Sequence, residues 1–131
     1  MNSKQEVVEF DAALIELSRE PKTIELIQSL VNVFDDQCKH LEVMWGLIHF
    51  IETFPQQLLI DTIVSQTSAL HHQALGWLRN LYGRLLRGET TKEIFITSVR
   101  RLPEEDRHYA TQIINSLIDD KSVAIKLHLF D

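Results

Sequence analysis

Two pairs of side chains in this sequence have the residue types and the helical spacing of metal ligands. His49 and Glu52 are three residues apart, and so are Glu105 and His108. Residues at that spacing share one helix face, where a histidine and a carboxylate can bind the same metal ion. Di-iron bundles, however, require two Glu-x-x-His units and two further glutamates. A metal-dependent helical enzyme is therefore one hypothesis. The structural alternative is that Glu52 bonds to His49, to an arginine of the helix predicted over residues 72–87, such as Arg79, or to free backbone amides.

No other catalytic or cofactor-binding motif is present in the sequence. The four glycines, Gly46, Gly76, Gly83 and Gly88, match neither GxxxxGK nor GxGxxG, and there is no GxSxG. The first three fall inside predicted helices, which predicts close contacts between helices. Cys38 is the single cysteine, so it is an ordinary thiol or a reactive one near a helix start. We expect a protein that is not an enzyme and needs no cofactor.

Negative charge is concentrated in the first half of the chain. Residues 1–66 carry eleven acids and four bases, a net charge of −7, and the remainder carries nine bases and eight acids. An acidic half argues against a nucleic-acid-binding face and suits a basic protein partner, although it also serves solubility alone. The arginines of the second half are interleaved with acids, which is typical of a solvated face with ion pairs.

The length of 131 residues fits one domain, residues 1–131. The first residues lack the basic-then-apolar pattern of a signal peptide. No apolar run approaches the roughly 18 residues that a membrane span requires. We therefore expect a soluble, cytoplasmic protein that does not enter a membrane.

The hydrophobic pattern has the helical period almost throughout and predicts an all-α fold. The predicted helices span residues 4–19, 22–34, 39–53, 56–66, 72–87, 91–101 and 104 to about 119. Proline marks three of the boundaries, at Pro21, Pro55 and Pro103. Ile24 and Leu41 belong to the predicted inward stripes of the second and third helices. The prediction is thus about seven short antiparallel helices.

Several polar residues are predicted to begin these helices. Ser3 with Glu6, and Thr90 with Glu93, have the spacing of a capping box. Asp35 and Asp36 are the N-cap candidates for the third helix. Gly88 is the expected C-cap of the fifth.

The last segment has a different period. Val123, Ile125, Leu127 and Leu129 alternate with other residues, which favours a short C-terminal strand over residues 122–130. The same residues also permit a short helix. An exposed edge strand could pair with another chain.

The predicted helix starts recur every 33 to 35 residues along the chain, at about 4, 38, 71 and 104 and again at about 22, 56 and 91. Helix pairs at this period form HEAT-like and armadillo-like stacks. The fold prediction is therefore a HEAT-like stack, with a plain helical bundle as the alternative.

The segment Met44–Pro55, MWGLIHFIETFP, resembles the all-helical immunity proteins of bacterial contact-dependent growth inhibition and polymorphic toxin systems, and immunity protein 30 in particular. The likeness extends loosely over residues 20–120 as a succession of short helices. It implies one partner, the C-terminal toxin domain delivered by a neighbouring cell. Such toxins are often nucleases with basic clefts, which the acidic half of this chain would suit. The family has no catalytic residues to carry over.

The resulting hypothesis is a protein that binds a basic toxin domain and blocks its active-site cleft. The candidate partner-binding residues are Asp35, Asp36, Glu42, Asp61, His71 and His72. The two histidines are more typical of polar residues in a loop or at a helix start than of metal ligands. The alternative is a HEAT-like adaptor protein without a toxin partner.

Overall fold

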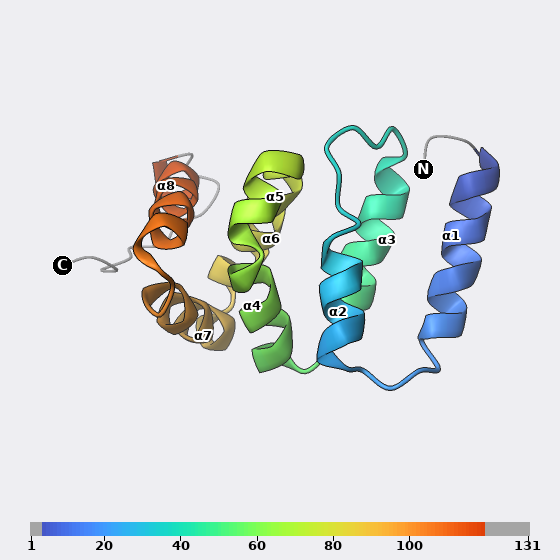
Figure 1. Ribbon diagram of the computed structural model, residues 1–131, viewed down its shortest axis with the longest axis horizontal. Coiled ribbons are helices and arrows are strands. Elements are labelled where there is room, and N and C mark those ends of the chain that lie inside the picture. Colours follow the sequence, from blue (N-terminus) through green and yellow to red (C-terminus); the bar gives the residue numbers. More distant parts are fainter. Residues whose placement is uncertain (1–3, 120–131) are drawn as a thin grey trace.

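The computed structural model describes residues 4–119, and every regular element in that range is an α-helix (Figure 1). The helices are α1 (Lys4–Leu17), α2 (Ile24–Val31), α3 (Leu41–Ile51), α4 (Gln56–Ser65), α5 (Thr67–Gln73), α6 (Leu75–Arg87), α7 (Glu89–Arg100) and α8 (Glu104–Asp119). The predicted all-α class is confirmed for this range. The predicted C-terminal strand and Ser3 of the first capping box lie outside the described residues. A search of these eight helices for one able to span a membrane finds none.

The helices stand in a row, with α1 at one end and α8 at the other (Figure 1). In this view α3 lies behind α2, and α6 lies behind α4 and α5, so the middle of the row is two layers deep. α1 packs on α3, and α2 packs on both α3 and α4. α4 and α6 both pack on α7, while α5 and α6 pack on α8. Each helix therefore contacts helices that are near it in sequence.

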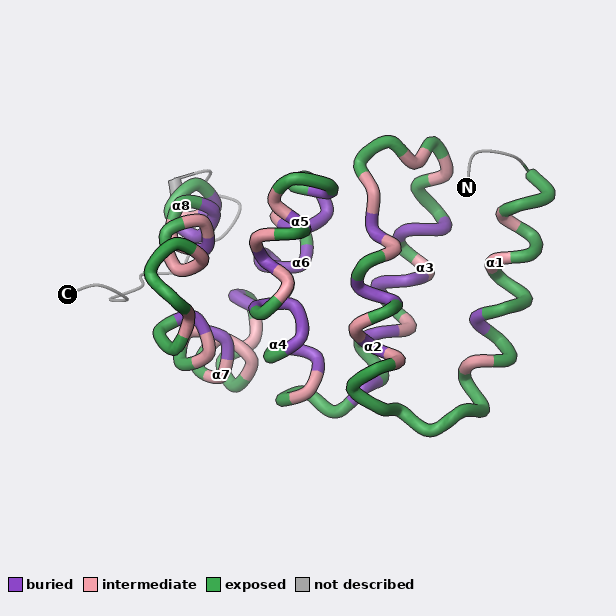
Figure 2. The backbone as a smooth tube through the Cα atoms, viewed as in Figure 1, coloured by how far each residue is buried: buried purple, intermediate pink, exposed green. Residues whose placement is uncertain are grey.

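The core is a continuous cluster of aliphatic and aromatic side chains that runs along this row. α6 has seven buried residues, and α3 and α4 have five each, so these three helices are large contributors to it. Figure 2 shows the buried segments gathered in the middle of the row, whereas α1 is exposed over most of its length. Two residues of the predicted inward stripes are instead at the surface. Ile24 is 49% exposed and Leu41 is 58% exposed, because each is the first residue of its helix, beyond the end of the buried stripe.

Residues 4–119 form one helix more than the sequence predicted for that range. The predicted break before residue 72 is absent, and the helical chain continues through α5 to Gln73. It ends at Ala74, whose φ of −149° and ψ of 51° are not helical, so α6 begins at Leu75 rather than at residue 72. α4 and α5 are separated only by Gln66, which has a φ of −96° and a ψ of 9°. Neither break has a proline or glycine, the residues that usually mark such a boundary.

Two of the predicted helix caps are wrong. His40, and not Asp35 or Asp36, occupies the N-cap position of α3. α7 begins at Glu89 with Gly88 as its N-cap, so Thr90 lies inside the helix. The hydroxyl of Thr91 bonds backwards to the Leu85 and Gly88 carbonyls. Gly88 does end α6, as predicted.

The close contacts between helices that were predicted at the three helix glycines are not found. A Cβ atom at Gly46 or Gly83 would have no neighbouring atom within 4 Å. At Gly76 it would lie 3.1 Å from a carboxylate oxygen of Asp36. The absence of a side chain at Gly76 therefore makes room for a specific polar contact, which holds the segment between α2 and α3.

Candidate functional site

Asp36 caps a helix distant from it in the sequence. Its carboxylate accepts hydrogen bonds from the backbone N–H groups of Gly76, at 2.9 Å, and Trp77, at 3.3 Å. Both amides lie in the first turn of α6, where no helical carbonyl is available to them, and negative charge there also complements the helix dipole. Asp36 is thus a structural residue, and its carboxylate is already engaged.

Gln73 fixes the same segment from the end of α5. Its side-chain amide donates to the backbone carbonyls of Asn32, at 2.9 Å, and Phe34, at 2.7 Å. The backbone N–H of Asp36 donates in return to the Gln73 carbonyl at 3.4 Å. Residues 32–40, which connect α2 to α3 without regular structure, are therefore held at both α5 and α6. We call residues 32–40 the α2–α3 segment.

Asp35 and Glu42 are the predicted acidic residues that remain most available at this end of the molecule. Asp35 is half-buried and accepts a hydrogen bond from the Gln37 backbone N–H at 2.8 Å, which forms a local turn. The side chain of Glu42 is 70% exposed, and its carboxylate lies 3.4 Å from the His40 imidazole. An exposed pair of this kind contributes little to stability. Both carboxylates can therefore meet a partner at small cost to the fold.

Next to this segment, α3 presents large apolar side chains to solvent. Leu41 and Trp45 are one helical turn apart, and Trp45 is 37% exposed. The ring of Trp45 meets the buried ring of Trp77 edge to face, with centroids 5.5 Å apart. Trp45 was not among the predicted partner-binding residues. Its helical spacing from His49 and Glu52, both exposed, is the signal in the sequence that indicates a surface position.

Glu52 pairs with an arginine of α6, which is one of the structural alternatives predicted for it. The arginine is Arg84 rather than Arg79. The Glu52 carboxylate accepts from Arg84 Nε at 2.8 Å and from Arg84 Nη2 at 2.6 Å. This bonding to Glu52 raises the pKa of Arg84. The guanidinium also lies over the Trp45 ring, 6.0 Å from its centroid. Arg79 instead bonds to Ser116 of α8.

The side chains proposed as metal ligands are not assembled into a metal site. Glu52 is engaged by Arg84, and Glu105 and His108 lie on α8, exposed to solvent. Among residues 4–119 no group of three or more histidine, cysteine or acidic side chains is arranged to hold an ion. Cys38 is half-buried, with its sulfur 3.8 Å from the His40 carbonyl oxygen.

His71 and His72 lie on α5, directly before Gln73, and their rings are engaged with α8 rather than with the acidic residues of the α2–α3 segment. Both rings contact Tyr109 of α8, with centroid distances of 4.4 Å for His71 and 6.0 Å for His72. Nδ1 of His71 is buried and has no hydrogen-bond partner. The two histidines therefore belong to the packing between α5 and α8.

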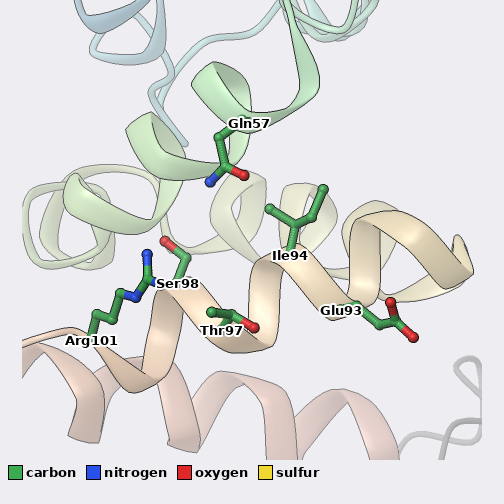
Figure 3. A pocket seen from close by; sticks show the side chains of 6 residues that line it. All are labelled: Gln57, Glu93, Ile94, Thr97, Ser98 and Arg101. Atoms are coloured by element: carbon green, nitrogen blue, oxygen red, sulfur yellow. The ribbon is translucent and has the colours of Figure 1, made fainter.

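Asp61 lies on α4, where its carboxylate joins α4 to α7. It accepts hydrogen bonds from Gln57, at 3.0 Å, and from Ser98, at 3.1 Å. Gln57 and Ser98 line a shallow pocket of about 210 Å³ between these helices (Figure 3), together with Glu93, Ile94, Thr97 and Arg101. This volume is below the roughly 300–1,000 Å³ of typical small-molecule sites. The six predicted residues are thus divided among three places: Asp35, Asp36 and Glu42 within residues 35–42, His71 and His72 on α5, and Asp61 on α4.

The chain matches one protein family. The family model of immunity protein 30 matches residues 1–95, which include α1–α6 and the whole α2–α3 segment. No curated protein and no solved structure matches the sequence significantly. Immunity proteins of this family are toxin inhibitors without enzymatic activity, which confirms the prediction that the chain is not an enzyme. The match covers nearly three quarters of the 131 residues. The chain therefore belongs to the immunity protein 30 family, whose members act on a cognate toxin.

Proposed function

We propose that this chain neutralises a nuclease toxin by placing the acidic residues 35–42 over the basic cleft in which the toxin binds nucleic acid. Family membership supplies the toxin as the partner. The net charge of −7 over residues 1–66 supports a basic surface on that toxin. We also propose the cytoplasm as the place of neutralisation, because a nuclease that enters a cell meets its nucleic acid substrate there.

The observation that carries the proposal is the fixed position of the α2–α3 segment. Residues 35–42 contain three carboxylates and one lysine. Asp36 and Gln73 hold this stretch against α5 and α6, so little conformational entropy remains to be lost when it binds. Asp35 and Glu42 are then presented on a rigid support.

Charge reversal at Asp35 and Glu42 tests the proposal without removing the Asp36 cap. The variant Asp35→Lys/Glu42→Lys should bind the toxin more weakly, by about tenfold or more, because its lysines would face basic residues. Its affinity should also depend less on salt than that of the unchanged chain. The partner for this measurement is the C-terminal domain of the protein encoded directly upstream, and the readouts are the Kd and nuclease activity at increasing salt.

The matched control is Glu93→Lys/Glu105→Lys, which changes the net charge by the same amount on α7 and α8. Both residues are exposed and distant in sequence from the α2–α3 segment. The control should retain most of the affinity. Equal affinities for the two variants would show that only the overall charge matters, and the proposed face would be wrong. An upstream domain that is not inhibited by the unchanged chain would contradict toxin neutralisation of this kind.

We further propose that the fold is a HEAT-like stack and that residues 1–131 form a single domain. Trp45 contacts Trp77 and Glu52 contacts Arg84, and the two members of each pair are 32 residues apart. Two contacts with one offset require α3 and α6 to lie side by side and to run in the same direction. This offset is close to the period predicted from the sequence and supports a repeat of helix pairs.

A further inference from the structure

The outer face of α3 exposes an aromatic and an aliphatic side chain where an ordinary surface helix carries polar residues. Leu41 is 58% exposed and Trp45 is 37% exposed, and they lie one turn apart. Tryptophan and arginine are the residues most enriched among those that dominate binding energy at protein interfaces. We call Leu41, Trp45, Glu52 and Arg84 the Trp45 patch.

The Trp45 patch is held in one conformation before any partner binds. The Trp77 ring supports one edge of Trp45, and the Arg84 guanidinium lies over its face. Arg84 is itself fixed by two hydrogen bonds to Glu52. A large side chain that is already immobilised loses little rotamer freedom on association, so more of its contact energy becomes affinity.

The surroundings of the Trp45 patch indicate the charge of its occupant. Trp77 links the patch to the α2–α3 segment, because its backbone N–H donates to Asp36 while its ring contacts Trp45. Glu42 follows Leu41 directly and is exposed. The one arginine of the patch is neutralised by Glu52. The apolar surface is thus bordered by carboxylates and suits a basic surface that also carries apolar side chains.

We propose that the Trp45 patch is the anchor at which the toxin docks, with Leu41 and Trp45 buried under a basic, partly apolar surface of the toxin. This inference rests on the proposed function and adds to it the part of the molecule that supplies most of the binding energy. Asp35 and Glu42 then form the charged border of the same interface. Their negative charge directs the encounter with the basic toxin.

Leu41→Lys tests the anchor directly. Leu41 is more than half exposed, so the substitution leaves the core intact, but it introduces a positive charge where the basic partner would dock. The matched control is Ile15→Lys, the same kind of change at a residue of α1 that is 62% exposed. Leu41→Lys should weaken binding to the upstream-encoded toxin domain by about tenfold or more, and Ile15→Lys should weaken it much less.

Three outcomes of this experiment would overturn the inference. Equal affinities of Leu41→Lys and the unchanged chain would show that the patch is outside the interface, although toxin binding itself would stand. A loss confined to Ile15→Lys would place the toxin on α1 instead. Dimerisation of the isolated chain that Leu41→Lys abolishes, measured by analytical ultracentrifugation, would identify a second copy as the occupant. Failure of the unchanged chain to bind the toxin would instead contradict the proposed function.

Tryptophan fluorescence gives a second readout that does not depend on a change in affinity. The chain has two tryptophans, and Trp77 is only 7% exposed, so a neutral quencher such as acrylamide reaches mainly Trp45. Saturation with a tryptophan-free variant of the toxin domain should reduce the quenching constant severalfold. Unchanged quenching in the saturated complex would show that Trp45 remains open to solvent, and the anchor would be disproved.

Discussion

Tyr82 is the largest fully buried side chain, and its hydroxyl meets one polar partner. Thr67 of α5 lies 2.5 Å from the Tyr82 hydroxyl and bonds also to the Ile63 carbonyl, at 3.4 Å. Because the Thr67 hydroxyl has one proton to donate to Ile63, Tyr82 is the donor in the shared bond. The Tyr82 ring packs against Phe95 of α7. Tyr82 therefore connects α5, α6 and α7 through one side chain.

Tyr82→Phe should lower the free energy of unfolding by about 1 kcal/mol at neutral pH, because one buried hydrogen bond is lost while Thr67 keeps its other partner. Burial raises the pKa of Tyr82 well above its ordinary value of 10.0. The unfolded chain thus loses this proton at lower pH than the folded chain does, and stability falls as the pH rises above 10. Urea unfolding at several pH values should show a smaller fall for Tyr82→Phe. Parallel curves for both proteins would contradict the role of Tyr82.

The residue types and charges near the candidate site could be read from the sequence, but the partners of those residues could not. Asp35 and Asp36 were predicted to cap the third helix, and both were predicted with Glu42 to bind a partner. The bonds of Asp36 to Gly76 and Trp77 span about forty residues, and no local pattern records a contact of that length. Leu41 was predicted to be buried because its spacing fits the inward stripe of α3. It is exposed because α3 begins at this residue, beyond the end of the buried stripe.

The α2–α3 segment depends on the first turn of α6 for its position. Asp36→Ala should destabilise the fold by about 1 kcal/mol, the usual cost of losing an N-cap acceptor. Asp36→Asn keeps an acceptor and should cost less. Gly76→Ala should give less than the roughly 1 kcal/mol that alanine normally adds over glycine in a helix, because its Cβ would lie 3.1 Å from the Asp36 carboxylate and push it from the Gly76 and Trp77 amides. Chemical denaturation followed by circular dichroism measures all three.

Asp11→Ala on α1 is the control for the loss of an exposed carboxylate and should change stability by less than about 0.5 kcal/mol. If Asp36→Ala is no more destabilising than this control, the carboxylate does not cap α6 in solution. Asp36→Ala should also weaken toxin binding, because Asp35 would no longer be held in place.

Long amphipathic helices with clear boundaries were the most predictable part of the fold. Pro55 and Pro103 precede α4 and α8 directly, so these helices begin where the sequence predicted. The break between α5 and α6 could not be predicted in this way. Ala74 is a good helix former that is fully buried here, and its non-helical conformation is imposed by packing rather than by local preference. Tertiary contacts therefore produce the break between α5 and α6, which the sequence pattern did not predict.

Stability is not distributed evenly along the row of helices. α1 stands at one end, packs chiefly on α3, and has Leu14 as its one buried residue. α6 has seven buried residues and packs on α5, α7 and α8. Elements with little buried apolar surface open at lower free energy than the core does. The proposed binding face is on α3, which packs against both α1 and α2.

Hydrogen exchange should therefore reveal a gradient along the molecule, with backbone amides of α1 exchanging well before those of α4 and α6. Leu14→Ala should accelerate exchange in α1 by roughly tenfold or more, since it removes most of the buried contact with α3. It should leave the slowest amides of α6 almost unchanged, because α1 would open without the rest of the row. If Leu14→Ala accelerates α1 and α6 equally, the eight helices unfold as one cooperative unit. In that case α1 stabilises the whole row of helices, including the proposed toxin-binding face on α3. Destabilising variants of α1 would then also neutralise the toxin less well.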